Sequence, residues 1–258
     1  MVLLPINLII MKKSILSILV MAVSFGGFAQ QLSGTSTYFE IRTYYANDGK
    51  LPDLIKRFQD HTLSLFEKSG MENIIYFLPV DNTDNSLTYI LGYPDEKSRD
   101  VMWGKFMNDP EWQKVFEESR VNGALVKSVD QTFMKLAPGL NEGPIPQASG
   151  IFQLRIYTCF EGKLDNLIAR FKDHTQDLFA KQGLKNYPYW ITVEKDGSQP
   201  KLIYLLGDKD QTSFEADFQN FARDPAWVKA KEMSEADGKI VENVAATFFK
   251  TLPFSPIK

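Results

Sequence analysis

The sequence predicts an α+β protein in which two ferredoxin-like βαββαβ repeats pack as one intrachain α+β barrel. Two histidines occur in the 258 residues, and both lie in the same local sequence, RFQDHT at 57–62 and RFKDHT at 170–175. A shift of 113 residues superimposes the motifs, and 12 of the 19 residues at positions 49–67 are then identical to their counterparts. Each copy also shows strand and helix periodicities in the order β-α-β-β-α-β.

The first 29 residues have the character of a secretory signal peptide. They contain no Asp or Glu, Lys12 and Lys13 precede an apolar run, and a small-x-small site ends at Ala29. Met11 is then the expected start, and residues 1–10 belong to an over-extended reading frame. A signal anchor is the alternative, but the apolar run is shorter than the ~20 residues that span a bilayer. We expect a periplasmic or secreted protein without a membrane span after cleavage.

The first strand of each copy has one apolar face and one polar and aromatic face. Residues 37–45 alternate, so that the side chains of Glu40, Arg42 and Tyr44 share one face. The second copy places Gln153, Arg155 and Tyr157 in the same way. We expect the helices to cover the apolar face and the polar face to turn toward the facing sheet, which would give the barrel a partly polar interior.

The later elements follow in the order of the fold. Apolar residues at helical spacing predict a helix from Leu51 that stops near Gly70. Residues 73–80 and 87–93 are predicted strands joined by the turn 81–85, residues 97–120 a helical region and residues 126–136 the closing strand. Asp109-Pro110 predicts an N-cap that divides the helical region, with Trp112 packed inward, and Asp224-Pro225 repeats this signal.

A Pro- and Gly-rich segment separates the copies and sets the domain boundaries. We expect a signal peptide at 1–29, an N-terminal tail at 30–37, a first domain at 38–136, a linker at 137–150, a second domain at 151–253 and a C-terminal tail at 254–258.

Composition argues against several classes of function. The net charge of −3 would fall to −5 after the loss of Lys12 and Lys13, so we expect no nucleic-acid partner. Cys159 is the single cysteine, which excludes an internal disulfide and a cysteine zinc site and predicts a buried, inert thiol. Phosphate-binding glycine loops, nucleophile elbows and nucleotide fingerprints are absent from the sequence.

The joint order of these residues resembles the NIPSNAP family, whose members look like dimeric α+β barrel proteins. The resemblance is carried, in the first copy, by Arg42 and Tyr44, the helix start at 49–51, Phe58 with His61, residues 65–66, Gly70 and the F-x-x-D-P-x-W run at 106–112. The second copy repeats all of them, and the resemblance covers nearly all of residues 38–253. The mitochondrial and vesicle roles of eukaryotic relatives do not transfer to a chain with a secretion signal.

His61 and His174 are candidate catalytic residues. At the margin of a helix that covers a sheet, an imidazole can reach a pocket between the two and act in proton transfer or bind a haem iron. The alternative is a structural histidine at the edge of the core. A metal site is not expected, because each copy supplies one imidazole and too few further ligands.

Arg42 with Tyr44, and Arg155 with Tyr157, are candidate ligand-binding pairs, because residues two apart on a strand share a face. A guanidinium beside a phenol can hold a carboxylate or an enolate oxygen. The alternative is a structural ion pair of Arg42, for instance with Glu40.

Two functions follow as hypotheses. The first is a secreted or periplasmic NIPSNAP-like protein that binds a small molecule or a protein partner, with no cofactor and possible homo-oligomers. The second is a cofactor-independent monooxygenase or isomerase of the α+β barrel type acting on an aromatic or enolisable substrate; haem binding through one histidine is a third. A cavity on which Arg, Tyr and His converge would favour the enzyme, and a barrel filled by side chains would favour binding.

Overall fold

The computed structural model describes residues 35–146 and 148–258. The predicted signal peptide and residues 30–34 of the predicted tail lie outside the described residues. Along the described part of the chain, no helix combines the length and the apolar character needed to cross a membrane.

The strands form one closed antiparallel barrel. The first repeat supplies β1 (Tyr38–Ala46), β2 (Glu72–Pro79), β3 (Ser86–Tyr93) and β4 (Val126–Leu136), and the second supplies β5 (Ile151–Cys159), β6 (Lys185–Thr192), β7 (Leu202–Asp208) and β8 (Val241–Thr251). The order around the barrel is β1-β3-β2-β8-β5-β7-β6-β4. The edge strands of one repeat therefore pair with those of the other, β2 with β8 and β4 with β6. This confirms the predicted α+β fold with two ferredoxin-like repeats in one intrachain barrel.

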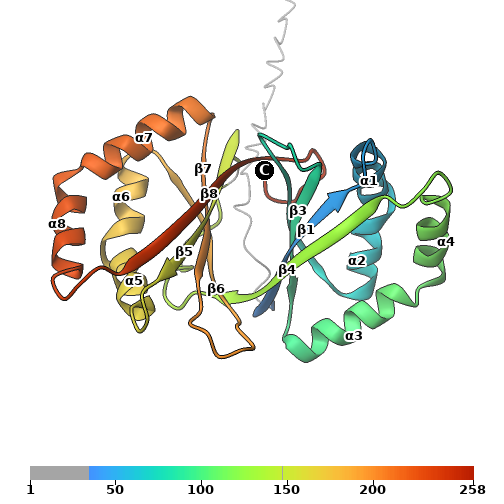
Figure 1. Ribbon diagram of the computed structural model, residues 1–258, viewed down its shortest axis with the longest axis horizontal. Helices are drawn as coiled ribbons and strands as arrows, with labels where there is room; N and C mark the ends of the chain where they lie inside the picture. Colours follow the sequence, from blue (N-terminus) through green and yellow to red (C-terminus); the bar gives the residue numbers. More distant parts are fainter. Residues whose placement is uncertain (1–34, 147) are drawn as a thin grey trace, which may run out of the picture.

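The helices of the two repeats cover opposite outer sides of the barrel (Figure 1). On one side lie α1 (Leu51–Arg57), the π-helical turn η1 (Phe58–Thr62), α2 (Leu63–Ser69), α3 (Glu96–Met107) and α4 (Pro110–Glu118). On the other side lie α5 (Leu164–Arg170), the π-helical turn η2 (Phe171–Thr175), α6 (Gln176–Lys181), α7 (Gln211–Arg223) and α8 (Pro225–Ser234). Each helical layer packs on the outer face of its own four strands.

The predicted helix signals are confirmed. Asp109 and Asp224 are the N-caps of α4 and α8, and their side chains accept hydrogen bonds from the backbone N–H of Glu111 at 2.8 Å and of Ala226 at 2.9 Å. Gly70 ends α2 with φ at 98°, a left-handed conformation that favours glycine. The long predicted helical regions are thus divided where the sequence indicates.

The barrel interior is mainly apolar and filled by side chains of both repeats, so the expectation that the helices cover the apolar face and that the polar face of β1 and β5 turns inward was wrong. Its core contains Phe39 of β1, Phe152 and Leu154 of β5 and the fully buried Trp190 of β6, with Ile41 packed against them. A closed barrel excludes water from its inside. The more apolar face of each strand therefore turns inward, because polar groups without partners are costly there. The hydroxyls of Thr43 and Thr88, which lie on this face, are paired with each other at 3.0 Å.

The polar and aromatic face of β1 and β5 lies under the helices. The guanidinium of Arg42 lies 4.6 Å from the Trp103 ring of α3, and the Tyr44 ring lies 5.8 Å from Phe58 of η1. In the second repeat the rings of Tyr157 and Phe171 are also 5.8 Å apart. This face can carry polar groups because neighbouring helices supply partners for them.

Cys159 is buried at the end of β5, as the sequence predicts. Burial raises the pKa of its thiol to about 11. The thiolate, which is the reactive form, is therefore scarce at neutral pH.

Candidate functional site

The repeated RFxDHT motif forms the end of one α-helix and a π-helical turn in both repeats. The hydroxyl of Thr62 donates to the Arg57 carbonyl at 3.2 Å, and that of Thr175 donates to the Arg170 carbonyl at 3.0 Å. The i+5 spacing of these bonds matches the wider turn of a π-helix, which in proteins occurs often at functional sites.

This turn divides the motif into a buried and an exposed part. Arg57, Phe58 and Thr62 are buried, whereas Asp60 and His61 are exposed. The second copy divides its motif in the same way, with Arg170 buried and His174 exposed. The arginine of the motif, and not its histidine, is thus directed into the molecule.

A cavity of about 270 Å³ lies between the helices and the sheet of the first repeat. Aromatic and aliphatic side chains supply most of its walls, and its polar groups come from Arg42, Tyr44, Arg57 and Thr62. The remaining wall consists of Phe58, Phe66, Trp103, Phe106, Met107, Trp112, Phe116, Val126 and Val129.

The second repeat has an equivalent cavity of about 320 Å³. Most of its lining residues are the counterparts of those in the first: Tyr157, Arg170, Phe171, Thr175, Phe179, Phe221, Trp227, Val241 and Val244. Lys231, Glu235 and Lys239 line it as well, in place of the additional aromatic and aliphatic groups of the first repeat. The two cavities therefore share a frame and differ in charge.

Glu40 holds Arg42 in the first cavity. This fully buried carboxylate pairs with Arg42 and accepts from Arg99 at 3.0 and 3.1 Å, from the Tyr93 hydroxyl at 3.0 Å and from Trp103 Nε1 at 3.2 Å. Burial alone would lower the pKa of Arg42, but Tyr89, Tyr44 and Glu40 together raise it above its ordinary value. The structural pair offered as the alternative for Arg42 is thus present, while its guanidinium still borders the cavity.

Arg57 and Arg170 occupy equivalent places with different partners. Arg57 donates to Ser119 Oγ at 3.2 Å, and Arg170 donates likewise to Ser234 Oγ at 3.3 Å. The buried Nε of both arginines meets no acceptor among the described residues. Arg170 also pairs with Glu235 at 2.9 Å, whereas Arg57 has no such carboxylate among the described residues. Burial lowers the pKa of Arg57 from its ordinary value, and the charge of Arg120 lowers it further. Arginine nevertheless stays protonated in proteins.

The structure brings Arg155 and Tyr157 together, as predicted from their spacing. Arg155 donates to the hydroxyls of Tyr204 at 3.0 Å and Tyr157 at 3.2 Å and to Gln153 Oε1 at 2.5 Å. Tyr157 lines the second cavity, whereas Arg155 is not among its lining residues. Arg155 therefore contacts the wall through its hydrogen bond to Tyr157.

The two candidate histidines lie outside these cavities. His61 is exposed and lines a separate outer hollow of about 320 Å³ together with Asp60 and Arg57, and His174 is exposed as well. The described residues contain no group of three or more His, Cys, Asp or Glu side chains that could hold a metal ion. Haem ligation through one histidine stays a prediction.

The sequence interpretation missed Arg57 and Arg170 as site residues. Both are identical between the copies, as the histidines are, and both precede a buried phenylalanine of the motif. The repetition of an arginine next to the apolar residues of the predicted helix could have identified both as site residues. The angular position of residues 58–62 could not be predicted, because the π-helical turn changes the 100° step that an α-helix would give.

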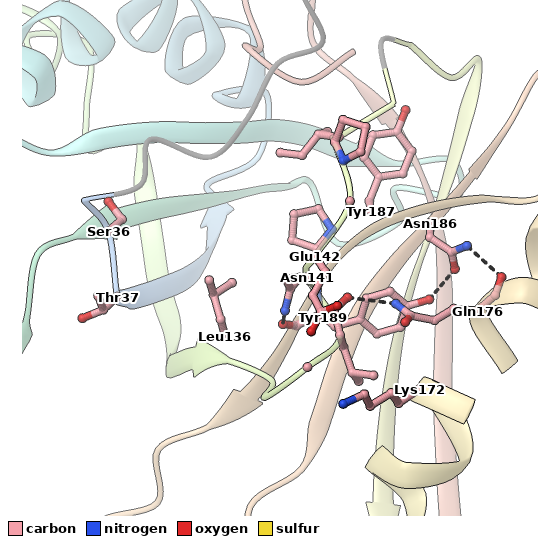
Figure 2. A pocket seen from close by; sticks show the side chains of 16 residues that line it. Ser36, Thr37, Leu136, Asn141, Glu142, Lys172, Gln176, Asn186, Tyr187 and Tyr189 are labelled. Atoms are coloured by element: carbon pink, nitrogen blue, oxygen red, sulfur yellow. Dashed lines mark hydrogen bonds between the residues drawn. The ribbon is translucent and has the colours of Figure 1, made fainter. Parts of the chain in front are cut away.

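A larger hollow of about 630 Å³ lies beside the linker (Figure 2). Its polar groups bond to one another: the Tyr189 hydroxyl donates to Asn186 Oδ1 at 2.6 Å, Asn186 Nδ2 to the Gln176 carbonyl at 3.0 Å and Gln176 Nε2 to the Leu140 carbonyl at 2.9 Å. The last of these bonds fastens the linker to the second repeat. The two cavities under the helices are lined by arginines, whereas the hollow beside the linker is not. These two cavities are therefore the stronger candidates for a ligand site.

Comparison with solved structures supports the fold. A NIPSNAP domain protein from Burkholderia xenovorans is 24% identical, with 39% of this chain and 95% of that chain covered and a TM-score of 0.35. An anthrone oxidase-like protein is 11% identical over 84% of this chain and 92% of its own, with a TM-score of 0.57. A monooxygenase-like protein from Fusobacterium nucleatum is 8% identical over 85% and 94%, with a TM-score of 0.54. The last two share the two-repeat barrel across most of the chain.

Comparison with curated proteins finds no match. The family model described as NIPSNAP matches the chain twice, at residues 39–139 and 152–256. The matches include both strands with their Arg and Tyr, both RFxDHT motifs and both D-P-x-W caps. The chain therefore belongs to the NIPSNAP family and carries two copies of its domain.

Proposed function

We propose that the protein binds a small, mainly aromatic molecule in the cavities between the helices and the sheet of each repeat. The observation that carries this proposal is that both repeats keep an equivalent cavity with a buried arginine, a tyrosine and a wall of aromatic rings. The second cavity, at about 320 Å³, stands at the lower end of the ~300–1,000 Å³ usual for ligand pockets, and the first, at about 270 Å³, lies just below it. The barrel interior is filled by side chains, so it offers no comparable site among the described residues.

A binding screen with fragments tests this proposal. Val129 and Val244 line the two cavities and are 38% and 40% exposed, so phenylalanine at both positions narrows the cavities without disturbing the core. Small aromatic fragments should bind the wild-type protein and lose their affinity for the Val129→Phe, Val244→Phe double variant. Val121→Phe, at a position 80% exposed and outside both cavities, is the control and should bind as the wild type does. Binding that persists in the double variant would reject the proposal.

A second candidate is a cofactor-independent monooxygenase or isomerase acting on an aromatic or enolisable substrate. Its support is that Arg42, Tyr44 and Arg57 line one cavity, where guanidinium groups can stabilise an enolate oxygen. The resemblance to the anthrone oxidase-like and monooxygenase-like proteins concerns the fold and adds little weight. His61 lies outside this cavity, so a base there would have to be another group.

Oxygen uptake with enolisable aromatic ketones tests the enzymatic candidate. Turnover that falls about 100-fold in Arg57→Gln would support it, because one oxyanion-stabilising group contributes on that order. Binding without oxygen uptake or isomerisation would leave the binding function alone.

We also propose that the protein acts in the periplasm or outside the cell. The support is the N-terminal sequence alone, with Lys12 and Lys13 before an apolar run and a cleavage site after Ala29. Expressed with its N-terminus in a bacterium, the protein should be recovered outside the cytoplasm with Gln30 as its first residue. Mass spectrometry of the intact protein checks this, and a cytoplasmic chain that begins at Met1 or Met11 would contradict it.

A further inference from the structure

The two repeats differ at one charged position beside their cavities. In the second repeat, Glu235 directly after α8 forms the ion pair with Arg170. Its counterpart in the first repeat, 115 residues earlier, is Arg120. Arg120 is exposed, and its guanidinium lies over the Phe116 ring at 4.7 Å. The first repeat thus has a positive charge where the second has a carboxylate.

Arg57 consequently lacks a counter-ion within the described part of the chain. It is 6% exposed, and no carboxylate of a described residue lies within ion-pair distance of its guanidinium. Asp53, Asp60 and Glu118 line the outer hollow beside it without reaching it. Arg42 has Glu40 as its partner. Arg155 has no carboxylate partner among the described residues either, but it donates to Tyr204, Tyr157 and Gln153 and lines neither cavity. A buried charge is costly unless it is paired, so an external anion has more to gain at Arg57 than at Arg42 or Arg170, the other arginines of the cavity walls.

We propose that the first cavity binds the anionic group of a small aromatic acid with Arg57 as its counter-ion, and that Glu235 closes this mode of binding in the second cavity. The inference rests on the proposed binding function and names the class of ligand. The fork of a guanidinium matches the two oxygens of a carboxylate. The rings of Phe66, Phe106 and Trp112 line the same cavity and suit the apolar part of such an acid.

The second cavity is not without positive charge, since Lys231 and Lys239 also line it. Both lysines are exposed, and water screens exposed ammonium groups so that they contribute little to affinity. The buried group of that cavity is Arg170, which Glu235 already neutralises at 2.9 Å. We therefore expect neutral aromatic ligands to be accepted equally in both cavities and acids to prefer the first.

Calorimetric titration with benzoate and with benzamide, its neutral analogue, tests this inference. Arg120→Glu supplies Arg57 with an internal carboxylate at the position of Glu235, and it changes an exposed residue, so the fold is not at risk. Benzoate should bind this variant and Arg57→Gln about 10- to 100-fold more weakly than the wild type. Benzamide should bind Arg120→Glu as it binds the wild type, because Arg120 lies outside the cavity.

Two further variants complete the experiment. Lys114→Glu, on the exposed side of α4 and outside both cavities, changes the net charge by the same amount as Arg120→Glu and should bind benzoate as the wild type does. Glu235→Gln frees Arg170 and should add a second benzoate site. Equal affinity for benzoate and benzamide, or no loss in Arg120→Glu, would overturn the anion assignment and leave the binding function standing. If neither compound binds and the fragment screen gives no hit, both the anion assignment and the proposed binding function are overturned.

Discussion

Arg57 and Arg170 show how one neighbouring residue changes the role of a buried charge. Both guanidinium groups lie beside an aromatic cavity, 5.3 Å from the ring of Trp112 and of Trp227 respectively. One has a carboxylate partner and the other has none among the described residues. The same side chain is therefore structural in the second repeat and available to a ligand in the first.

Stability measurements on two matched variants should separate these roles. Arg57→Met removes an unpaired buried charge, so we expect the free energy of unfolding to stay unchanged or to rise by up to about 2 kcal/mol. Arg170→Met leaves the half-buried Glu235 without its partner and should cost about 1–3 kcal/mol. Urea denaturation of both variants checks this. An equal loss at both positions would show that Arg57 is as structural as Arg170.

The sequence predicted some contacts between side chains correctly. It predicted less well which side chains are buried and which are exposed. The spacing of Arg42 and Tyr44 on one strand face was correct, and so was the pairing of Arg42 with Glu40 as an alternative. The exposure of His61 could not be predicted, because it depends on the π-helical turn. The partner of Arg170 could not be predicted either, since Glu235 directly follows α8, far along the chain.

The π-helical turns η1 and η2 are the elements that place the arginines. Each turn keeps a buried threonine whose hydroxyl bonds to the carbonyl of the arginine. Thr175→Val removes this bond and leaves a carbonyl with one partner fewer. We expect a loss of about 0.5–1.5 kcal/mol, and the same for Thr62→Val. Thermal unfolding checks this, with Thr175→Ser, which keeps the hydroxyl, as a control that should lose less.

The faces of the strands show what an alternating pattern can and cannot predict. The alternation in residues 37–45 correctly separated an apolar face from a polar one. The alternation did not determine which of the two faces the helices cover. An apolar face can be buried either inside the barrel or under a layer of helices. Closure of the barrel decided this, since the sealed inside takes the apolar face of both repeats.

Closure also joins the two repeats into one cooperative unit. Strands β2 and β4 pair with β8 and β6 of the other repeat, and the interior core draws on both. We therefore expect a single unfolding transition, with circular dichroism and tryptophan fluorescence giving the same midpoint. Two separate transitions would mean that the repeats are stable without each other.

Buried tyrosines predict a loss of stability at alkaline pH. Burial raises the pKa of Tyr76, Tyr89 and Tyr204 well above the ordinary value, and burial together with Glu96 raises that of Tyr38 to about 12. The folded protein therefore holds these protons more tightly than the unfolded chain does. Their contribution is complete below about pH 10 and decreases as the pH rises above it. Denaturation at increasing pH checks this, and a native protein whose phenols all ionise near pH 10 would contradict it.

The two helical layers lie on opposite sides of the barrel (Figure 1). One cavity lies under each layer, and the barrel between them is filled by side chains. The most direct test of this account is a crystal structure of the protein soaked with 4-bromobenzoate, with the bromine located by its anomalous signal. We expect the bromine in the first cavity beside Trp112, with the carboxylate at Arg57. Bromine found in the hollow beside the linker, or in neither cavity, would contradict it.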